Sequence, residues 1–263
     1  MDNFNFLRKH QQLQYTIMFD KLIDLGFAMV GYCKGDDSSF WNLALTNQIL
    51  TKKELFKVEE TMQSLNRNPG VYFENRESLK PLVKFLKGKG YEFSFEDSWM
   101  FHSGRHIDVS RFGLVKKVTN ETELKVFLKT FDACYQKDDP QNPYGELGDY
   151  LKVAEKVWHR HHKTNRLEYF LVYKGKKPVA VSTLTNHGSI GYISNVGSFR
   201  EVRGEGFGKI ASLYCVDVSK KRGNTKHCLA TEEGTYPNEF YKRIGFITRF
   251  TAVAYVKKGE KNG

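Results

Sequence analysis

The segment from residue 195 to residue 218 reads NVGSFREVRGEGFGKIASLYCVDV. It places three glycines at alternate positions between an apolar run and a segment whose apolar residues recur with helical spacing. Glycine is costly in regular structure and is favoured where the backbone needs a positive φ or a close approach. We therefore predict a strand that ends near residues 196–198, then a tight turn, and then a helix that begins near Phe207.

A turn of this kind can bind an anion. Its glycines, Gly204, Gly206 and Gly208, allow successive backbone N–H groups to point into one concavity. The first N–H groups of the following helix have no acceptor within the helix and lie at the positive end of its dipole. Arg203, with Arg200 close by, adds guanidinium groups that can pair with a pyrophosphate. The stretch therefore predicts a diphosphate site, which side chains larger than hydrogen at the three glycines would block.

Strands and helices alternate on both sides of this turn. Upstream, FGLVKKV (112–118) is predicted as a strand, Asn120 with Glu123 can cap a helix, and a second helix follows over 147–158. Three runs joined by hairpin connections are predicted as strands: EYFLVYKGKKP (168–178), VAVSTLT (179–185) and GYISNVG (191–197). Downstream we predict a helix from Phe207, a strand HCLATEE (227–233), a short helix around 240–243 and a last strand TRFTAVAYV (248–256).

The glycine turn does not match two common phosphate-binding loops. A P-loop needs Gly-Lys followed by Ser or Thr, whereas Gly208-Lys209 is followed by isoleucine, and the glycine spacing misses the Rossmann pattern by one place. The hexapeptide R-G-E-G-F-G (203–208) instead resembles the R-x-x-G-x-[GA] motif of the GNAT superfamily, the acyl-CoA-dependent N-acetyltransferases. A second signature of that superfamily, a tyrosine shortly before Gly-Phe, resembles E-F-Y-K-R-I-G-F (239–246). One departure is Arg200, where many members have proline.

The order of the elements strengthens this resemblance. Members have a strand, two helices, three antiparallel strands, the motif, a long helix, a strand, a helix and a strand. Residues 110–257 are predicted in that same order. The resemblance implies the GNAT fold, an α+β architecture with a mixed and mostly antiparallel central sheet.

The first hundred residues are also predicted to mix helices and strands, but they have no glycine motif. Thr51 and Glu54 form a capping box at a helix start. VYFEN (71–75) is predicted as a short strand, and Asn75 can cap the helix that follows it. Aromatic residues then alternate over 91–101, as on one face of a strand.

A similar order of predicted elements occurs in both halves of the chain. Gly90-Tyr91 follows a strand and a helix and precedes an alternating strand, and Gly245-Phe246 is in the same position near the C-terminus. We therefore predict two tandem αβ domains divided in the polar stretch SGRHID (103–108). The first, 1–108, is expected to be a degenerate GNAT-like domain, and the second, 109–258, the catalytic acetyltransferase domain.

Composition excludes several classes of protein. With 263 residues, 40% of them hydrophobic and 14% aromatic, the chain is globular rather than disordered. The formal net charge of +11 favours an anionic ligand, but the lysines are spread along the chain and form no basic stripe interleaved with aromatics. We therefore do not expect nucleic acid as the partner.

Other features argue for a cytoplasmic protein without a membrane span. No apolar run approaches the roughly twenty residues that cross a bilayer, and the start of the chain has no signal-peptide core. The four cysteines, Cys33, Cys134, Cys215 and Cys228, have no C-x-x-C spacing, so neither disulfides nor a zinc site are expected. A homodimer is compatible with this interpretation.

The resemblance also implies which residues bind acetyl-CoA, the expected co-substrate. The residues expected to hold its pyrophosphate are Arg203, Gly204, Glu205, Gly206, Phe207, Gly208 and Lys209. The backbone of Val196, Gly197 and Ser198 would pair with the pantetheine arm as an extra strand. In the family the two strands at this level splay apart. An amide near Val196 or Gly197 could then polarise the thioester carbonyl.

Tyr241 resembles the family's acid, which protonates the departing CoA thiolate. A base for the acceptor amine is less evident, with Glu232, Glu233 and Glu168 as candidates and a chain of water molecules as the alternative. Glu232 is the residue we put forward. His159 and His162 share a helix face, but no third ligand lies in register, so we expect no metal.

These observations predict an N-acetyltransferase that moves an acetyl group from acetyl-CoA to a primary amine by direct transfer in a ternary complex. We expect the acceptor to be a small molecule, since the aromatic strand at 91–101 could close one side of the acceptor cleft. Two alternatives stay open. One is a protein acetyltransferase acting on a lysine or a chain terminus, and the other is a non-catalytic module that binds acyl-CoA.

Overall fold

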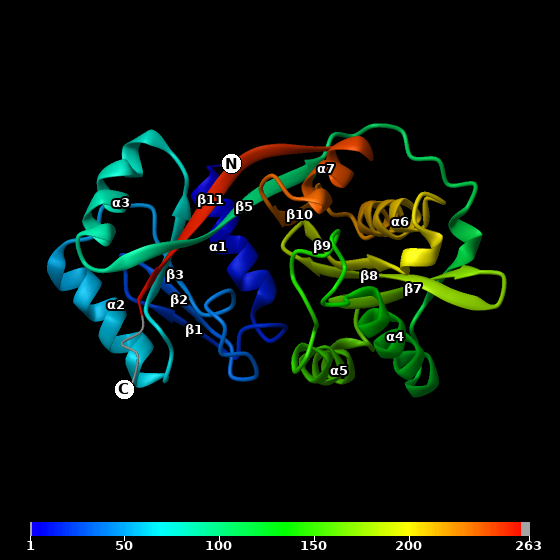
Figure 1. Cartoon of the computed structure of the whole chain (residues 1–263), viewed down its shortest axis with the longest axis horizontal. Helices are drawn as coiled ribbons and strands as arrows, with labels where there is room; N and C mark the ends of the chain where they lie inside the picture. The colour runs from blue at the N-terminus through cyan, green and yellow to red at the C-terminus, as the bar shows by residue number, and fades with distance from the viewer. Residues whose placement is uncertain (1, 259–263) are drawn as a thin grey trace. The chain divides into compact units, whose positions relative to one another are not determined.

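The computed structural model describes residues 2–258 and divides the chain into two compact units (Figure 1). The first unit contains the residues up to Trp99 together with those from Phe250 onward. The second unit contains Met100–Arg249 and therefore includes the whole glycine turn.

Two long strands, β5 (Tyr91–His102) and β11 (Phe246–Lys257), begin in one unit and end in the other. The compact units consequently do not coincide with the continuous ranges 1–108 and 109–258. The physical reason is a pairing between distant segments: the second half of β11 lies antiparallel to β4 (Gly70–Glu74), so it belongs with the first unit.

The first unit is built on a mixed sheet. Its remaining elements are α1 (Asn3–Gln14), β1 (Lys21–Asp24), β2 (Met29–Tyr32), β3 (Ala44–Leu45), α2 (Lys52–Ser64), a 3-10 turn at Glu77–Leu79 and α3 (Lys80–Lys87). The strand order is β1-β2-β3-β4-β11-β5. The β3–β4 pair is parallel, whereas β1–β2, β2–β3 and β4–β11 are antiparallel.

Helices cover both faces of this first sheet. On one face, Leu82 and Leu86 of α3 lie in a buried cluster with Val253 of β11. Phe250 lies three residues earlier on the same strand and therefore faces the other side. There its ring packs against Phe6 of α1, with 6.0 Å between ring centroids.

The second unit has the same α+β character. Its elements are a 3-10 turn at Phe112–Leu114, β6 (Val115–Lys117), α4 (Glu121–Cys134), α5 (Tyr150–His161), β7 (Leu167–Lys174), β8 (Lys177–His187), β9 (Ile190–Ser198), a 3-10 turn at Arg200–Val202, α6 (Phe207–Lys221), β10 (Lys226–Glu232) and α7 (Tyr236–Arg243). The strand order is β11-β5-β10-β9-β8-β7-β6. β6 to β9 are antiparallel neighbours and β9–β10 is parallel, which confirms the mostly antiparallel sheet.

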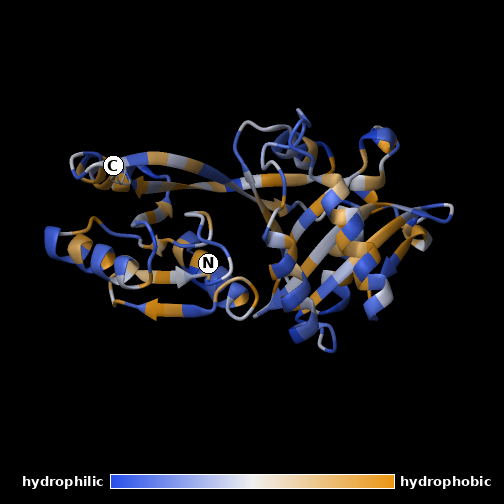
Figure 2. Ribbon diagram, turned by 60° about the horizontal axis from the view of Figure 1, so that its bottom comes forward, coloured by the Kyte–Doolittle hydropathy of each residue, from blue (hydrophilic) through white to orange (hydrophobic). Residues whose placement is uncertain are grey.

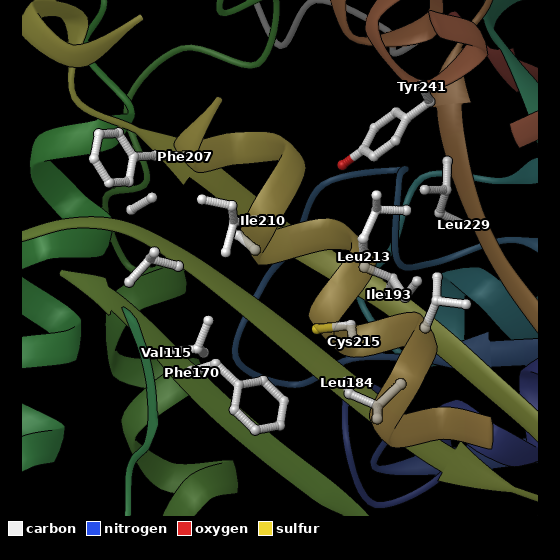
Figure 3. Close-up of a cluster of buried hydrophobic side chains, with 14 of the residues drawn as sticks. Val115, Phe170, Leu184, Ile193, Phe207, Ile210, Leu213, Cys215, Leu229 and Tyr241 are labelled. Atoms are coloured by element: carbon white, nitrogen blue, oxygen red, sulfur yellow. The ribbon is translucent and has the colours of Figure 1, made fainter. Parts of the chain in front are cut away.

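In this unit α6 and α7 lie on one face of the sheet and α4 and α5 on the other (Figure 1). The core between α6 and the sheet is formed by apolar side chains from several elements, among them Leu213 of α6, Leu229 of β10 and Tyr241 of α7 (Figure 3). Hydrophobic residues occupy much of the strands, whereas the connecting loops are largely hydrophilic (Figure 2). Among residues 2–258, no helix combines the length and the apolar character needed to cross a membrane.

Two of the predicted helix caps are confirmed. The backbone N–H of Glu54 donates to the hydroxyl of Thr51, and the Glu54 carboxylate accepts from the Thr51 N–H at 2.7 Å. The N–H of Glu123 donates to the Asn120 side chain at 3.0 Å.

The third predicted cap is wrong. The Asn75 amide donates to Glu96 at 2.7 Å, and the α-helix begins only at Lys80, after a 3-10 turn and with Pro81 in its first turn. Similarly, only residues 115–117 of the predicted strand 112–118 are extended, because a 3-10 turn precedes them.

Candidate active site

The glycine turn connects β9 to α6 as the sequence predicts. β9 ends at Ser198, the 3-10 turn follows, and α6 begins at Phe207. Gly204 and Gly206 have φ values of +83° and +85°. This left-handed conformation is readily adopted by glycine and strained for other residues, so it accounts for glycine at these two positions.

The start of α6 leaves its backbone donors open. Its N-cap, Gly206, has no side chain, and the first helical hydrogen bond runs from the N–H of Ile210 to the Gly206 carbonyl at 3.0 Å. Within residues 2–258, the N–H groups of Phe207, Gly208 and Lys209 have no hydrogen-bond acceptor. Open donors at the positive end of a fifteen-residue helix are suited to an anion.

The two arginines beside the turn are paired with carboxylates of the loop between α4 and α5. Both terminal nitrogens of Arg203 donate to Asp139, whose side chain is only 1% exposed. Arg200 donates to the carboxylate of Asp138 at 3.1 Å. Hydrogen bonding from Arg203 lowers the pKa of Asp139, so this ion pair is present at neutral pH. The main-chain donors, rather than the Arg203 guanidinium, are therefore the open groups at the turn.

Another arginine, which the sequence did not indicate, lies against the turn. Arg111 donates to the Glu205 carbonyl at 2.9 Å, and its guanidinium lies 5.2 Å from the centroid of the Phe207 ring. The Glu205 carboxylate accepts from Lys174 at 2.8 Å. No local pattern could have revealed Arg111, since it is 94 residues away from Glu205 in the sequence.

The two strands that lead to this region separate from each other. The parallel pairing of β9 with β10 covers three residue pairs and, within the described chain, ends at Tyr192 and Cys228, although both strands continue. The register between β8 and β9 also shifts, so β9 contains a bulge, where Asn195 has a φ of +52°. The outer edge of β9 is consequently left without a neighbouring strand beyond the bulge.

The hydrogen-bond pattern shows which groups face that edge. The Phe199 N–H donates across to Val179 of β8, and Val181 lies opposite Gly197. Since donors alternate along an antiparallel strand, the Gly197 N–H faces β8, whereas Val196 and Ser198 direct their backbone groups to the open edge. Of the two amides considered for the thioester carbonyl, that of Val196 is thus on the open side.

The end of α4 packs directly on this part of β9. The Tyr135 hydroxyl donates to the Val196 carbonyl at 3.1 Å. A Cβ atom at Gly197 would lie 2.6 Å from the Cβ of Cys134 and 3.0 Å from the Tyr135 ring. Gly197 is therefore needed for the close packing of α4, a reason that the sequence alone did not provide.

Tyr241 lies on the α6 side of the sheet and is 8% exposed. Figure 3 shows its ring beside Leu213 and Leu229, with the hydroxyl directed away from the α7 backbone. Burial raises the pKa of Tyr241 well above its usual value, while a hydrogen bond with Ser212 of α6 opposes that shift. The phenol is therefore protonated at neutral pH and has a proton to donate.

The three candidate bases occupy different places. Glu232 ends β10, next to Thr231, whose hydroxyl accepts from Asn238 of α7 at 3.0 Å. Successive strand residues face opposite sides, so Glu232 faces away from α7. The structure describes no contact between Glu232 and Tyr241 among its residues. Glu233 lies 3.9 Å from Lys242.

Glu168 is excluded as the base. Its side chain is 1% exposed and accepts hydrogen bonds from Lys117 and Arg222, each at 2.8 Å. Burial acts to raise the pKa of Glu168, but these two cations outweigh it and lower the pKa. Arg222 caps the C-terminal end of α6, so Glu168 lies at the opposite end of that helix from the glycine turn.

The histidine-rich end of α5 is occupied by local contacts. His159 lies 3.3 Å from the Glu121 carboxylate, and the His162 ring stacks on Trp158 with 4.0 Å between centroids. Residues 2–258 contain no group of three or more His, Cys, Asp or Glu side chains arranged to hold a metal ion.

Comparison with known proteins agrees with this geometry. Residues 126–246 match the family model described as Acetyltransferase (GNAT) family. Among curated proteins, none matches the sequence.

Similar folds occur among solved structures. The chain is similar to a GCN5-related N-acetyltransferase from Kribbella flavida, with a TM-score of 0.64 and 15% identity over 97% of this chain and 96% of that one. It is similar to a functionally unknown conserved protein from Staphylococcus epidermidis, with a TM-score of 0.64 and 13% identity over 93% and 96% of the two chains. A tandem GNAT protein from the clavulanic acid biosynthesis pathway has a TM-score of 0.56 and 11% identity over 89% and 79%. These similarities confirm the predicted fold.

Proposed function

We propose that this protein is an N-acetyltransferase that moves an acetyl group from acetyl-CoA to a primary amine of a small molecule, a proposal supported by the match of residues 126–246 to the acetyltransferase (GNAT) family model. The family transfers acyl groups from acyl-CoA. The observation that carries the proposal is the pair of open main-chain edges in the second unit, at the start of α6 and along β9. These edges offer donors and acceptors for a diphosphate and for an extended arm.

In this proposal the start of α6 holds the diphosphate of acetyl-CoA. The N–H groups of Phe207, Gly208 and Lys209 supply the donors, and left-handed Gly204 and Gly206 keep them uncovered. Arg203 and Glu205 contribute through the backbone of the turn, since Asp139 and Lys174 hold their side chains. The unfilled donors are an observation of this chain that suits the ligand.

The open edge of β9 is proposed to bind the pantetheine arm. Val196 and Ser198 direct backbone groups to that edge, and the missing side chain of Gly197 keeps α4 close behind it. The amide of Val196 is the proposed donor to the thioester carbonyl oxygen. A fixed donor at that oxygen stabilises the negative charge that develops there during attack.

The proposed reaction needs two proton transfers. The acceptor nitrogen attacks the thioester carbonyl carbon, a C–N bond forms, the C–S bond breaks and its electron pair remains on sulfur. Tyr241 donates its phenolic proton to that sulfur, a role open to a phenol that is protonated at neutral pH. The proton that leaves the amine is accepted by Glu232, directly or through water.

The role of Glu232 can be tested against its neighbour. We expect E232Q to lower kcat by about a hundredfold, as loss of a general base does, while the affinity for acetyl-CoA stays unchanged. E233Q is the matched control, because Glu233 follows Glu232 directly and has the same charge. Equal kcat values for the two variants would remove Glu232 from the mechanism and leave water as the proton acceptor.

A small-molecule acceptor is supported by the loop between α4 and α5, which attaches to the β9 edge through Tyr135 and Tyr150. A loop fastened at this edge favours a compact acceptor over an extended peptide. Release of the CoA thiol, measured over a panel of small amines and of peptides with free lysines or N-termini, tests the function. Turnover with peptides alone would replace the small-molecule acceptor by a protein. Tight acetyl-CoA binding without turnover of any amine would contradict the proposal that the protein is an enzyme.

A further inference from the structure

The segment 135–150, which is the loop between α4 and α5 together with the first residue of α5, is fastened to the β9 bulge at both of its ends. At the first end, the Tyr135 hydroxyl donates to the Val196 carbonyl at 3.1 Å. At the second end, the Tyr150 hydroxyl donates to Oδ1 of Asn195, also at 3.1 Å. Two tyrosines therefore hold two consecutive residues of the bulge.

The middle of the same loop is fastened to the glycine turn. Asp139 accepts two hydrogen bonds from Arg203, and Asp138 accepts one from Arg200. Asp139 is also held by its own loop, since it accepts from the Gln141 N–H at 3.0 Å. One continuous segment thus contacts both parts of the proposed acyl-CoA site.

The bulge needs such support because its backbone is strained. Asn195 has a φ of +52°, a left-handed conformation that is unfavourable for residues other than glycine. Its side chain is fixed on two sides, by Tyr150 and by a bond from its Nδ2 to the Thr183 hydroxyl at 3.2 Å. A strained conformation persists only where its surroundings determine it more than once.

We propose that Tyr135 and Tyr150 are positioning residues for acyl transfer, which hold the bulge so that the Val196 amide stays directed at the thioester carbonyl. The inference rests on the proposed function of the β9 edge. The Tyr135 hydroxyl bonds to the Val196 carbonyl and thereby acts on the orientation of the Val196 backbone. Tyr150 acts on the left-handed backbone of Asn195 through its side chain. Neither tyrosine needs to touch the reacting atoms.

A matched control shows what the loss of a tyrosine hydrogen bond does when the tyrosine has a purely structural role. The Tyr169 hydroxyl donates to the Ala154 carbonyl at 2.9 Å and fastens α5 to β7, on the same face of the sheet. Tyr169 is 1% exposed, more buried than Tyr135, so removing its hydroxyl costs the fold at least as much. Among the described residues, its hydroxyl makes no hydrogen bond to the bulge. Y169F therefore reports what loss of a buried tyrosine hydrogen bond does by itself.

The test compares Y135F, Y150F and Y169F in the full-length chain. We expect Y135F and Y150F each to lower kcat about tenfold, the effect of one misplaced hydrogen bond of roughly 1 kcal/mol or slightly more. The dissociation constant for CoA should stay within about twofold, and Y169F should keep the wild-type kcat while losing thermal stability. Wild-type kcat in Y135F and Y150F, or an equal loss in Y169F, would overturn the inference.

A binding measurement separates this inference from the proposed function. Calorimetry with acetyl-CoA and with CoA gives the affinity gained from the acetyl group, and it needs no acceptor amine. We expect a severalfold preference of the wild type for acetyl-CoA that disappears in Y135F and persists in Y169F. If no amine is turned over but the preference behaves in this way, the positioning role stands and the enzymatic function fails. An unchanged preference in Y135F, or no binding of either ligand, overturns the positioning role.

Discussion

One succession of elements occurs twice in the chain: β4, α3 and β5 begin in the first unit, and β10, α7 and β11 begin in the second. Each helix has eight residues with a proline in its first turn, Pro81 or Pro237, and each following strand has twelve residues. The glycine before each strand has a positive φ, +81° at Gly90 and +102° at Gly245. The shared backbone therefore does not distinguish the units, and the difference lies in particular side chains and helix starts.

The first difference is the residue at the position of Tyr241. Tyr241 lies four residues after Pro237 and four before Gly245, whereas the same counts in the first unit lead to Phe85 or Leu86. Neither residue has a hydroxyl group. Only the second unit therefore has a phenol, the proposed acid, at this place in the repeated succession.

The second difference is how a helix starts. In the first unit, α2 starts with a closed capping box, in which Thr51 and Glu54 satisfy each other's backbone donors. In the second unit, α6 starts at Gly206, which has no side chain to do so. The proposed anion site is thus at the helix start that has no capping side chain, whereas the donors at the start of α2 are already satisfied.

The largest effect is expected from closing the open helix start. G206V places a β-branched residue at a φ of +85° and adds atoms beside the donors. We expect acetyl-CoA affinity to fall by more than about a hundredfold, since several hydrogen bonds to a charged group are lost together. Calorimetry measures this directly.

G90V is the matched control in the other unit. Gly90 has nearly the same φ, +81°, but it lies in the connection from a helix, α3, to a strand, β5, and no glycine motif surrounds it. Its strain should lower the melting temperature about as much as G206V does while leaving acetyl-CoA binding intact. Equal loss of binding in both variants would show that strain, rather than a blocked site, causes the effect.

The next effect concerns the acid. Y241F should lower kcat by about a hundredfold without changing acetyl-CoA affinity, because a general acid contributes to the transfer step and not to binding. The matched control is Y91F, which removes a hydroxyl that donates to Glu59 in the first unit. Steady-state kinetics of the two variants would refute the assignment if both kept the wild-type kcat.

The pH dependence follows from the same residue. Burial raises the pKa of Tyr241, and the protonated form is the active acid, so activity is present below that raised pKa and is lost only as pH rises through it. We therefore expect no alkaline loss of kcat attributable to Tyr241 up to at least the ordinary tyrosine range near pH 10. A loss near neutral pH that disappears in Y241F would contradict this.

The smallest effect on kcat is expected from substitution of Glu168. E168Q leaves Lys117 and Arg222 without their buried partner and should destabilise the protein by about 3 kcal/mol. The pKa of Glu168 is lowered, so its stabilisation is present above the ordinary carboxyl pKa and is lost as pH falls through the lowered value. Thermal unfolding between pH 7 and 3 should therefore show a smaller pH dependence for E168Q, with kcat per folded molecule within about twofold of wild type.

Much of the second unit could be predicted from local sequence. Three hairpin strands, the glycine turn and the helix from Phe207 each have a signal within a few neighbouring residues, and all are present. In the first unit, α1 and the strands of two to four residues before Leu45 gave no clear pattern. Asn75 was misassigned because its amide has a better partner in Glu96, 21 residues away.

The contacts that complete the site could not be predicted, because they join residues far apart in the chain. Tyr135 meets Val196 across 61 positions, and Arg203 meets Asp139 across 64. The start of α6 can be recognised from its glycine pattern. The contacts that the loop between α4 and α5 makes with it depend on packing and have no local sequence pattern. The pairing of β11 with β4 is likewise a contact between distant segments, and it places the second half of β11 in the first unit.

The most direct measurement is a crystal structure of the protein with CoA bound. We expect diphosphate oxygens within about 3 Å of the backbone nitrogens of Phe207, Gly208 and Lys209, with the arm of the ligand along the open edge of β9. A diphosphate bound elsewhere, or a start of α6 filled by the protein's own side chains, would contradict this expectation.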